Sequence, residues 1–229
     1  MCGRFTMTYP DARLLALALG IEAADLVDWT PRFNLAPTQA HFIVVLRGED
    51  RHVLPARWGL VNEWGTDANG AARTINARAE TLSERPSFRN AFEQRRCIVP
   101  ADGFYEWEGT RGERRPYWIH RRDGGLLLMA GLYEYWQPRP GVRECTFTIV
   151  TREANATVGR LHNRMPVIFD DAQADEWMFA RTPPARLQEL LRAAPEGGLQ
   201  LRAVSRAVNR VENEGEELLE PAAEQARLF

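Results

Sequence analysis

Apolar and polar residues alternate with a period of two along much of the chain, the pattern of β-strands that bury one face. In "HFIVVLRGEDRHVLPARW" two such runs flank a turn at residues 48–50, which predicts a β-hairpin. Between turn signals that contain glycine, proline or aspartate, further strands are predicted at residues 97–101, 103–108, 116–121, 126–136, 144–151 and 199–205. Strands therefore follow one another closely over most of the sequence.

Four stretches have the composition and end signals of helices instead. In "PDARLLALALG", Pro10 stands near the start and Gly20 at the end, as in a short helix. Residues 86–96, 171–179 and 184–194 predict three more helices. The expected fold class is α+β, with a largely antiparallel, barrel-like β-sheet core and peripheral helices. Because no internal repeat or long linker interrupts the pattern, residues 2–221 are expected to form a single domain and residues 222–229 a tail.

Composition excludes several classes of protein. The chain has 229 residues and 45% hydrophobic residues, yet no apolar run reaches the about 18 residues of a membrane span. "MCGRF" lacks the basic start and apolar centre of a secretory signal, so a cytoplasmic protein without membrane contact is expected. The 3 cysteines and 4 histidines have no metal-ligand spacing, which predicts no metal site. No cofactor is expected, and nothing in the sequence requires more than a monomer.

The basic residues have an unusual composition, since all 29 of them are arginine. The only ordinary amine of the protein is therefore the α-amino group at its N-terminus, and any imine chemistry with an aldehyde would have to occur there. Biased codon usage in the genome would explain the missing lysine without any functional reason.

Arginines and aromatic residues are interleaved between Arg73 and Arg122. Such a pattern fits a groove in which arginines contact phosphates and aromatic rings stack on bases. It also fits strands whose aromatic residues face the core while the arginines face solvent.

Four residues stand out as chemical candidates. Cys2 follows the initiator methionine directly, at a position where chains are usually frayed and expendable. Glu106 lies between Tyr105 and Trp107 in an otherwise apolar strand, where burial would raise its pKa. Asn76 would share one face of an extended segment with Arg78, and His162 precedes a basic turn. Each of the last three also has a structural explanation: Glu106 could lie on the outward face of an edge strand, Asn76 could form a turn with its amide, and His162 could be a loop histidine.

Six segments in this order, "MCGRF", "FNLAPTQ", "RWGL", "INARAET", "CIVPADGFYEW" and "LHNRMPVIF", resemble the SOS-response-associated peptidase family, whose domain is called SRAP. The later "VSRAVNRVENEGEELLEP" is similar to the C-terminal signature of that family. The resemblance extends from Cys2 to about Pro221, and six ordered motifs are far more specific than any one of them.

The resemblance implies a DNA damage response protein that shields abasic sites in single-stranded DNA. Members lose the initiator methionine, and the freed cysteine captures the aldehyde of the ring-opened sugar as a DNA–protein crosslink. A 1,2-aminothiol is suited to this step, because its amine (pKa about 8) can form an imine and its thiol (pKa about 8.5) can close a thiazolidine ring. The activity would be lyase-like. The family name adds a peptidase activity, such as self-cleavage after Met1, whereas an aminopeptidase of the host could equally remove that residue.

The same resemblance assigns roles to particular residues. Glu106 would act as general acid–base, His162 would contact the sugar oxygen as the ring opens, and Asn76 would hold Cys2 or the opened sugar. Arg4 and Arg78 would contact phosphates beside the lesion, and Trp64 would stack on bases. The DNA-binding residues expected in this way are Arg4, Asn34, Trp58, Trp64, Arg78, Thr151 and Arg164.

Two other classes of function remain open from the sequence. Class II glutamine amidotransferases also begin with Met-Cys-Gly and use the cysteine as a nucleophile on an amide, although a cation at Arg4 suits a phosphate better. A non-covalent single-strand-binding module, in which Cys2 is incidental, is the other alternative.

Overall fold

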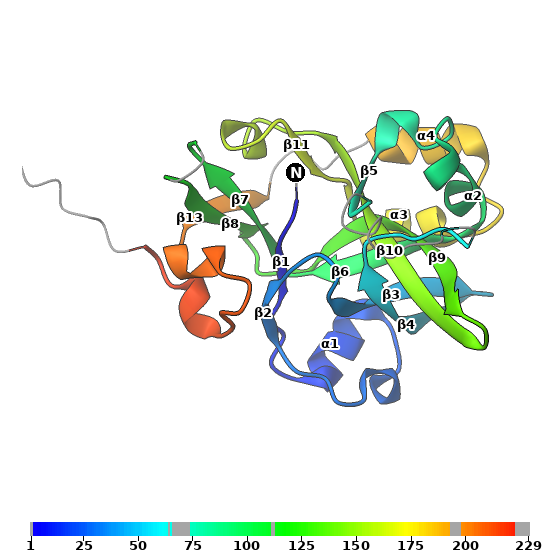
Figure 1. Cartoon of the computed structure of the whole chain (residues 1–229), viewed down its shortest axis with the longest axis horizontal. Coiled ribbons are helices and arrows are strands. Elements are labelled where there is room, and N and C mark those ends of the chain that lie inside the picture. Colours follow the sequence, from blue (N-terminus) through cyan, green and yellow to red (C-terminus); the bar gives the residue numbers. More distant parts are fainter. Residues whose placement is uncertain (1, 64, 66–73, 111–112, 193–197, 223–229) are drawn as a thin grey trace, which may run out of the picture.

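The computed structural model describes residues 2–63, 65, 74–110, 113–192 and 198–222, and these residues form two β-sheets with helices around them (Figure 1). The smaller sheet is antiparallel throughout. Its strands are, in spatial order, β13 (Leu199–Ala203), β8 (Arg115–Arg121), β7 (Gly103–Glu108), β1 (Phe5–Met7) and β2 (Arg32–Leu35).

The larger sheet closes into a five-strand barrel. Its strands are β10 (Val142–Glu153), β4 (Asp50–Trp58), β3 (Ala40–Arg47), β6 (Arg96–Ala101) and β9 (Leu127–Arg139), and β9 pairs again with β10. All neighbours in the barrel are antiparallel except β4 and β10, which run parallel. Three short strands extend it: β5 (Asn76–Arg78) and β11 (Arg164–Pro166) beside β10, and β12 (Ile168–Phe169) beside β9. The α+β fold with a largely antiparallel, barrel-like core is confirmed.

All four predicted helices form around these sheets. They are α1 (Ala12–Leu19), α2 (Pro86–Gln94), α3 (Asp171–Met178) and α4 (Pro184–Arg192), with 3₁₀ turns η1 (Ala23–Leu26), η3 (Ala79–Thr81), η4 (Val158–Arg160), η5 (Arg206–Asn209) and η6 (Glu216–Leu219). The ends of α1 follow from local chemistry. The side chain of Asp11 accepts hydrogen bonds from the first-turn amides of Arg13 and Leu14, and Gly20 ends the helix at φ +64°, a conformation that glycine adopts without strain.

One buried carboxyl at the junction of the two sheets holds β1 in place. Asp102 lies between the end of β6 and the start of β7, and its side chain accepts hydrogen bonds from the hydroxyls of Thr6 (2.5 Å) and Thr8 (2.6 Å) and from the amide of Thr8. The next residue must be glycine, because a Cβ on Gly103 would come within 2.1 Å of the Trp118 indole. This corner fixes the strand that begins three residues after Cys2.

No helix among the described residues is long and apolar enough to cross a membrane. Of the tail expected at residues 222–229, the structure describes only Ala222, whose amide donates to the carbonyl of Ala203 at 2.9 Å.

Candidate functional site

Cys2 lies at the start of the chain, just before β1 (Figure 1), and its side chain is fully buried. Its Sγ lies 3.9 Å from the backbone carbonyl oxygen of Arg4. Burial raises the pKa of this thiol, and the negative charge of Glu106 raises it further. The thiol is therefore kept protonated unless a base beside it accepts the proton.

Asn76 holds the backbone of Cys2. Its Nδ2 donates to the Cys2 carbonyl oxygen at 2.8 Å, across 74 residues of sequence. The amide is carried by β5, which runs parallel to β10 with Asn76 opposite Ile149. Asn76 Oδ1 is buried and has no hydrogen-bond partner among the residues that the structure describes. A free acceptor of this kind beside Cys2 can receive a hydrogen bond from a bound molecule.

Glu106 is the buried carboxyl of the site. It is 4% exposed and lies on β7, which has β8 on one side and β1 on the other. The outward face of an edge strand, one of the two explanations for this residue, is therefore wrong. Burial raises the pKa of Glu106, and the positive charge of His162 is among the effects that oppose the rise. A carboxyl whose pKa is raised in this way is suited to hold and to return a proton.

His162 has a defined tautomer when it is neutral. Its Nδ1 accepts a hydrogen bond from the Arg164 amide at 2.9 Å, so the proton of the neutral ring is on Nε2, where it can be donated. The ring is half-buried in the segment before β11. Its charge acts on Glu106, which itself acts on Cys2, so the fold brings three of the four chemical candidates into electrostatic contact and joins the fourth, Asn76, to Cys2 by a hydrogen bond.

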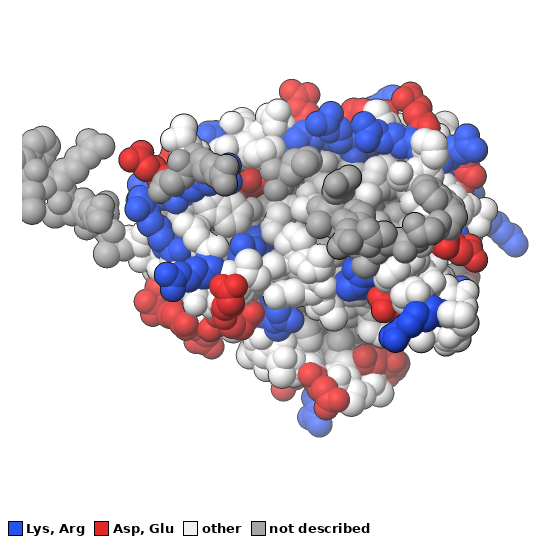
Figure 2. All heavy atoms as spheres, in the orientation of Figure 1, with Lys and Arg blue, Asp and Glu red and all other residues white. Residues whose placement is uncertain are grey.

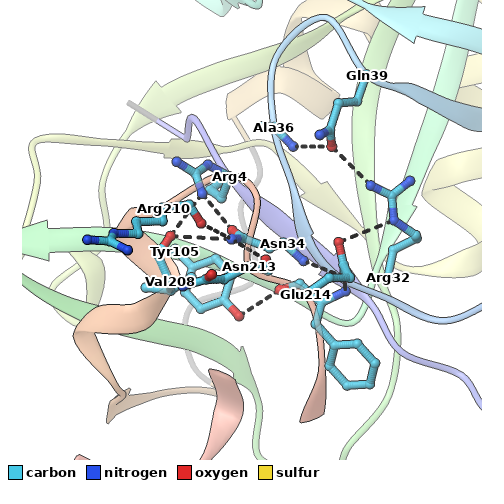
Figure 3. A network of polar contacts seen from close by, with 11 residues as sticks. Arg4, Arg32, Asn34, Ala36, Gln39, Tyr105, Val208, Arg210, Asn213 and Glu214 are labelled. Atoms are coloured by element: carbon cyan, nitrogen blue, oxygen red, sulfur yellow. Dashed lines mark hydrogen bonds and ion pairs between the residues drawn. The ribbon is translucent and has the colours of Figure 1, made fainter. Parts of the chain in front are cut away.

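The arginines expected at DNA differ in how they are held. The side chain of Arg78 is exposed and forms no hydrogen bond or ion pair within the described part of the chain, and its charge acts on the carboxylate of Glu80, which Arg164 binds. Arg164 is engaged: both of its terminal nitrogens bind the carboxylate of Glu80, at 2.6 and 2.8 Å, and Nη2 also donates to the Thr151 carbonyl at 2.6 Å. Arg4 is 9% exposed and bonded on one side only (Figure 3).

Charged side chains are unevenly distributed on the face drawn in Figure 2. Arginines are frequent along the upper and left margins of this face, while carboxylates gather at the lower left, near η5 and η6 (Figures 1 and 2). The exposed acidic residues of that segment are Glu212, Glu214, Glu216, Glu217 and Glu220.

Three residues expected at DNA have no exposed side chain in this structure. Asn34 and Thr151 are 0% exposed and Trp58 is 1% exposed. The Trp58 ring packs 5.0 Å from Phe5 and stacks on Phe147, and its indole nitrogen donates to the Ile75 carbonyl at 2.9 Å. A ring enclosed in this way presents no face to a base. These three side chains can support the site from the interior of the protein, but they do not line its surface.

Trp64 lies outside the described residues. For the interleaved arginines and aromatic residues, the core explanation holds for Phe104 and Tyr105, which are 0% exposed.

The sequence analysis missed Asp102, which anchors β1, and Glu80, which binds Arg164. No signal in the sequence spacing points to either, because their partners are 84 to 96 residues away. The described residues contain no group of histidine, cysteine and acidic side chains that could hold a metal ion.

The site thus combines Cys2, which precedes β1 of the smaller sheet and is held by Asn76, with the buried Glu106 of β7, in a fold that also contains a closed five-strand barrel. The family model described as SOS response associated peptidase (SRAP) matches residues 1–211, and the chain belongs to this family.

Relatives of known name match over most of the chain. It is 36% identical to abasic site processing protein YoqW of Bacillus subtilis over 222 residues, which cover 96% of this chain and 99% of that one. It is 32% identical to abasic site processing protein YedK of Escherichia coli, over 96% of this chain and 100% of that one. A solved structure from Bacteroides thetaiotaomicron superposes with a TM-score of 0.83, over 96% of this chain and 100% of that one, and at 23% identity it shows the shared fold.

Proposed function

We propose that this protein captures abasic sites in single-stranded DNA covalently, through the α-amine and the thiol of Cys2. The observation that carries the proposal is the placement of Cys2, whose carbonyl is held by Asn76 at 2.8 Å and whose buried thiol lies in the field of Glu106. Relatives named abasic site processing proteins, 32–36% identical over nearly the whole chain, support the choice of substrate.

The reaction needs Met1 to be removed so that the amine of Cys2 is free. This amine attacks the aldehyde carbon of the ring-opened sugar, and loss of one water leaves an imine. The sulfur then adds to the imine carbon while the nitrogen takes up a proton, which gives a five-membered thiazolidine. The second step is fast because amine and thiol belong to one residue, so that ring closure is unimolecular.

Glu106 is suited to the proton transfers of this sequence. Its raised pKa lets it give a proton to the departing water and accept one from the thiol, whose own pKa is raised by burial. Nε2–H of His162 would donate to the sugar oxygen as the ring opens, and Asn76 Oδ1 would accept from the amine or from a sugar hydroxyl. Arg78, exposed on the same short strand as Asn76, would contact a flanking phosphate.

The first test is a denaturing gel of the protein incubated with a single-stranded oligonucleotide that carries one abasic site. An intact-mass spectrum must first show that the chain begins at Cys2. We expect a band that survives heat and detergent, and that is absent with undamaged DNA and with Cys2→Ala. Because the chain contains no lysine, borohydride trapping of an imine reports the α-amine alone.

Failure to form this band from a correctly processed N-terminus would refute covalent capture. Glutaminase assays would then examine the amidotransferase alternative, and binding to intact oligonucleotides would examine the non-covalent one. A variant with an uncleaved glycine added before Met1 is expected to block both the removal of Met1 and the band. This result would show that the free amine of Cys2 is required, as the reaction demands.

A further inference from the structure

The segment at residues 205–219, which we call the C-terminal strap, lies against the smaller sheet, with η5 in contact with β8 and η6 in contact with β2 (Figures 1 and 3). It is fastened by apolar contacts, because Val208 is 0% and Leu218 is 1% exposed. Val208 belongs to a small cluster with Tyr105 and Trp118 of the sheet. The strap is therefore a packed part of the fold.

Asn34 of the edge strand β2 joins the strap to Arg4 (Figure 3). Its Nδ2 donates to the carbonyl oxygens of Arg210 and Asn213, each at 2.9 Å, and its Oδ1 accepts from Arg4 Nη1 at 2.6 Å. Glu214 fastens the same strand, since its carboxylate accepts from the backbone amides of Phe33 and Asn34. One fully buried amide thus connects the strap to the side chain two residues from Cys2.

The strap also contacts Arg4 and its neighbour directly. Arg4 Nη1 donates to the Val208 carbonyl at 2.9 Å, and the guanidinium carbon lies 5.9 Å from the centre of the Trp107 ring. The indole nitrogen of Trp107 in turn donates to Asn209 at 2.6 Å. Among the described residues, the hydrogen bonds of the guanidinium all come from Nη1, so that Nε and Nη2 are left as a free edge. This is an edge that can bind two oxygens of one phosphate.

The strap is acidic, which makes it a poor surface for DNA. Glu212, Glu216 and Glu217 are exposed along it, and a phosphate chain would be repelled there. An effect of the strap on DNA binding must therefore pass through the residues that it holds. An arginine already fixed in one conformation loses less side-chain entropy when it binds a phosphate than a mobile one does.

We propose that the C-terminal strap, acting through Asn34 and Glu214, positions Arg4 so that its Nε–Nη2 edge faces the phosphate beside the captured nucleotide. Asn34 and Glu214 are then positioning residues, and Arg4 is the DNA contact. The inference rests on the proposed function for its ligand, single-stranded DNA, but it does not depend on the covalent step.

The test measures reversible binding of the whole protein to a labelled single-stranded oligonucleotide with a tetrahydrofuran abasic analogue, which has no aldehyde. Fluorescence anisotropy gives Kd at several salt concentrations between about 50 and 300 mM, a range in which counterion release changes the affinity measurably. The slope of log Kd against log salt concentration counts phosphate contacts, at about 0.7 for each contact on a single strand. A loss of packing alone would not change this slope.

Five variants, four single and one double, separate the possibilities. Arg4→Gln is expected to weaken binding and to reduce the slope by about 0.7, the loss of one phosphate contact. Asn34→Leu and Glu214→Ala should do the same, and Arg4→Gln combined with Asn34→Leu should be no worse than Arg4→Gln alone. Glu216→Ala removes an exposed charge from the same strap, and the Glu216 side chain forms no hydrogen bond or ion pair with β2 among the described residues; this matched control should bind as tightly as the wild type or tighter.

The sign of the Glu214 result is decisive. If only overall charge matters, removing this carboxylate tightens DNA binding, whereas the strap proposal requires weaker binding. Wild-type slopes for both Asn34→Leu and Glu214→Ala, with a reduced slope for Arg4→Gln, would overturn the proposal and leave the proposed function standing. Absence of any binding by the wild type would also overturn the strap proposal, while the crosslinked band would still decide the proposed function. Glu214→Ala is at an exposed carboxylate, so it reports even if Asn34→Leu does not fold.

Discussion

Replacing Glu106 by glutamine should move two measurements in opposite directions. Glutamine keeps the size and shape of a side chain that is 4% exposed, but it can neither give nor take a proton. The rate of covalent capture at saturating DNA should fall about 10²–10⁴-fold, the usual contribution of a general acid–base. This corresponds to about 2.7–5.5 kcal/mol in activation free energy.

The same substitution should raise stability at neutral pH. Burial raises the pKa of Glu106 above its unfolded-state value, so the folded state binds the proton more tightly than the unfolded state does. The stabilisation from this proton is complete below about pH 4.3, the unfolded-state pKa, and is lost as pH rises through the folded-state pKa. At pH 7, well above the unfolded-state pKa, the wild type has lost stabilisation that the neutral glutamine of the variant keeps. The variant should therefore have the higher Tm at pH 7, and the difference should disappear near pH 4.

The assay is a time course quenched in detergent and read on a denaturing gel, with calorimetric melting at several pH values between 4 and 7. Glu108→Gln, an exposed glutamate on the same strand, is the control and should leave the capture rate unchanged. A wild-type capture rate in Glu106→Gln would remove Glu106 from the proton transfers. A lower Tm of this variant at pH 7 would show that the charged carboxylate stabilises the fold, against the direction of its pKa.

Three further substitutions test other parts of the site. Arg78→Gln should leave Tm unchanged, because the side chain is exposed, and should reduce the salt slope of DNA binding by about 0.7; an unchanged slope would exclude a phosphate contact. Trp58→Ala should lower the free energy of unfolding by about 3–5 kcal/mol, since the ring is 1% exposed in the core, and chemical denaturation with little loss of stability would contradict its burial. Asp102→Ala should cost about 1–3 kcal/mol for each group left unpaired, because the amide and hydroxyl of Thr8 lose their acceptor and the Thr6 hydroxyl keeps only the Gly103 carbonyl, with slower capture because β1 is released; a capture rate that stays at the wild-type value would show that this corner does not position Cys2.

The sequence by itself determines the helices, strands and turns, because each depends on residues that are close together in the chain. The period-two alternation predicts the strands of the barrel, Asp11 and Gly20 mark the ends of α1, and the turn near Gly48 marks the hairpin of β3 and β4. These features depend on neighbours within a few residues, so a sequence pattern contains all that is needed. The chemistry of a cysteine after the initiator methionine is local in the same sense, because its amine and thiol belong to one residue.

The tertiary structure alone decided which distant groups meet. Arg4 reaches Asn34 across 30 residues and Val208 across 204 residues, and such pairings depend on the packing of both sheets together. The same packing places the Trp58 side chain in the core, although the sequence analysis predicted that it would contact DNA. Periodicity shows that a residue lies on one face of a strand, but the closure of the barrel sets what covers that face. Whether Glu106 is buried or exposed at an edge depends on the assembly of the smaller sheet, because β1, which covers one side of β7, comes from a distant part of the sequence.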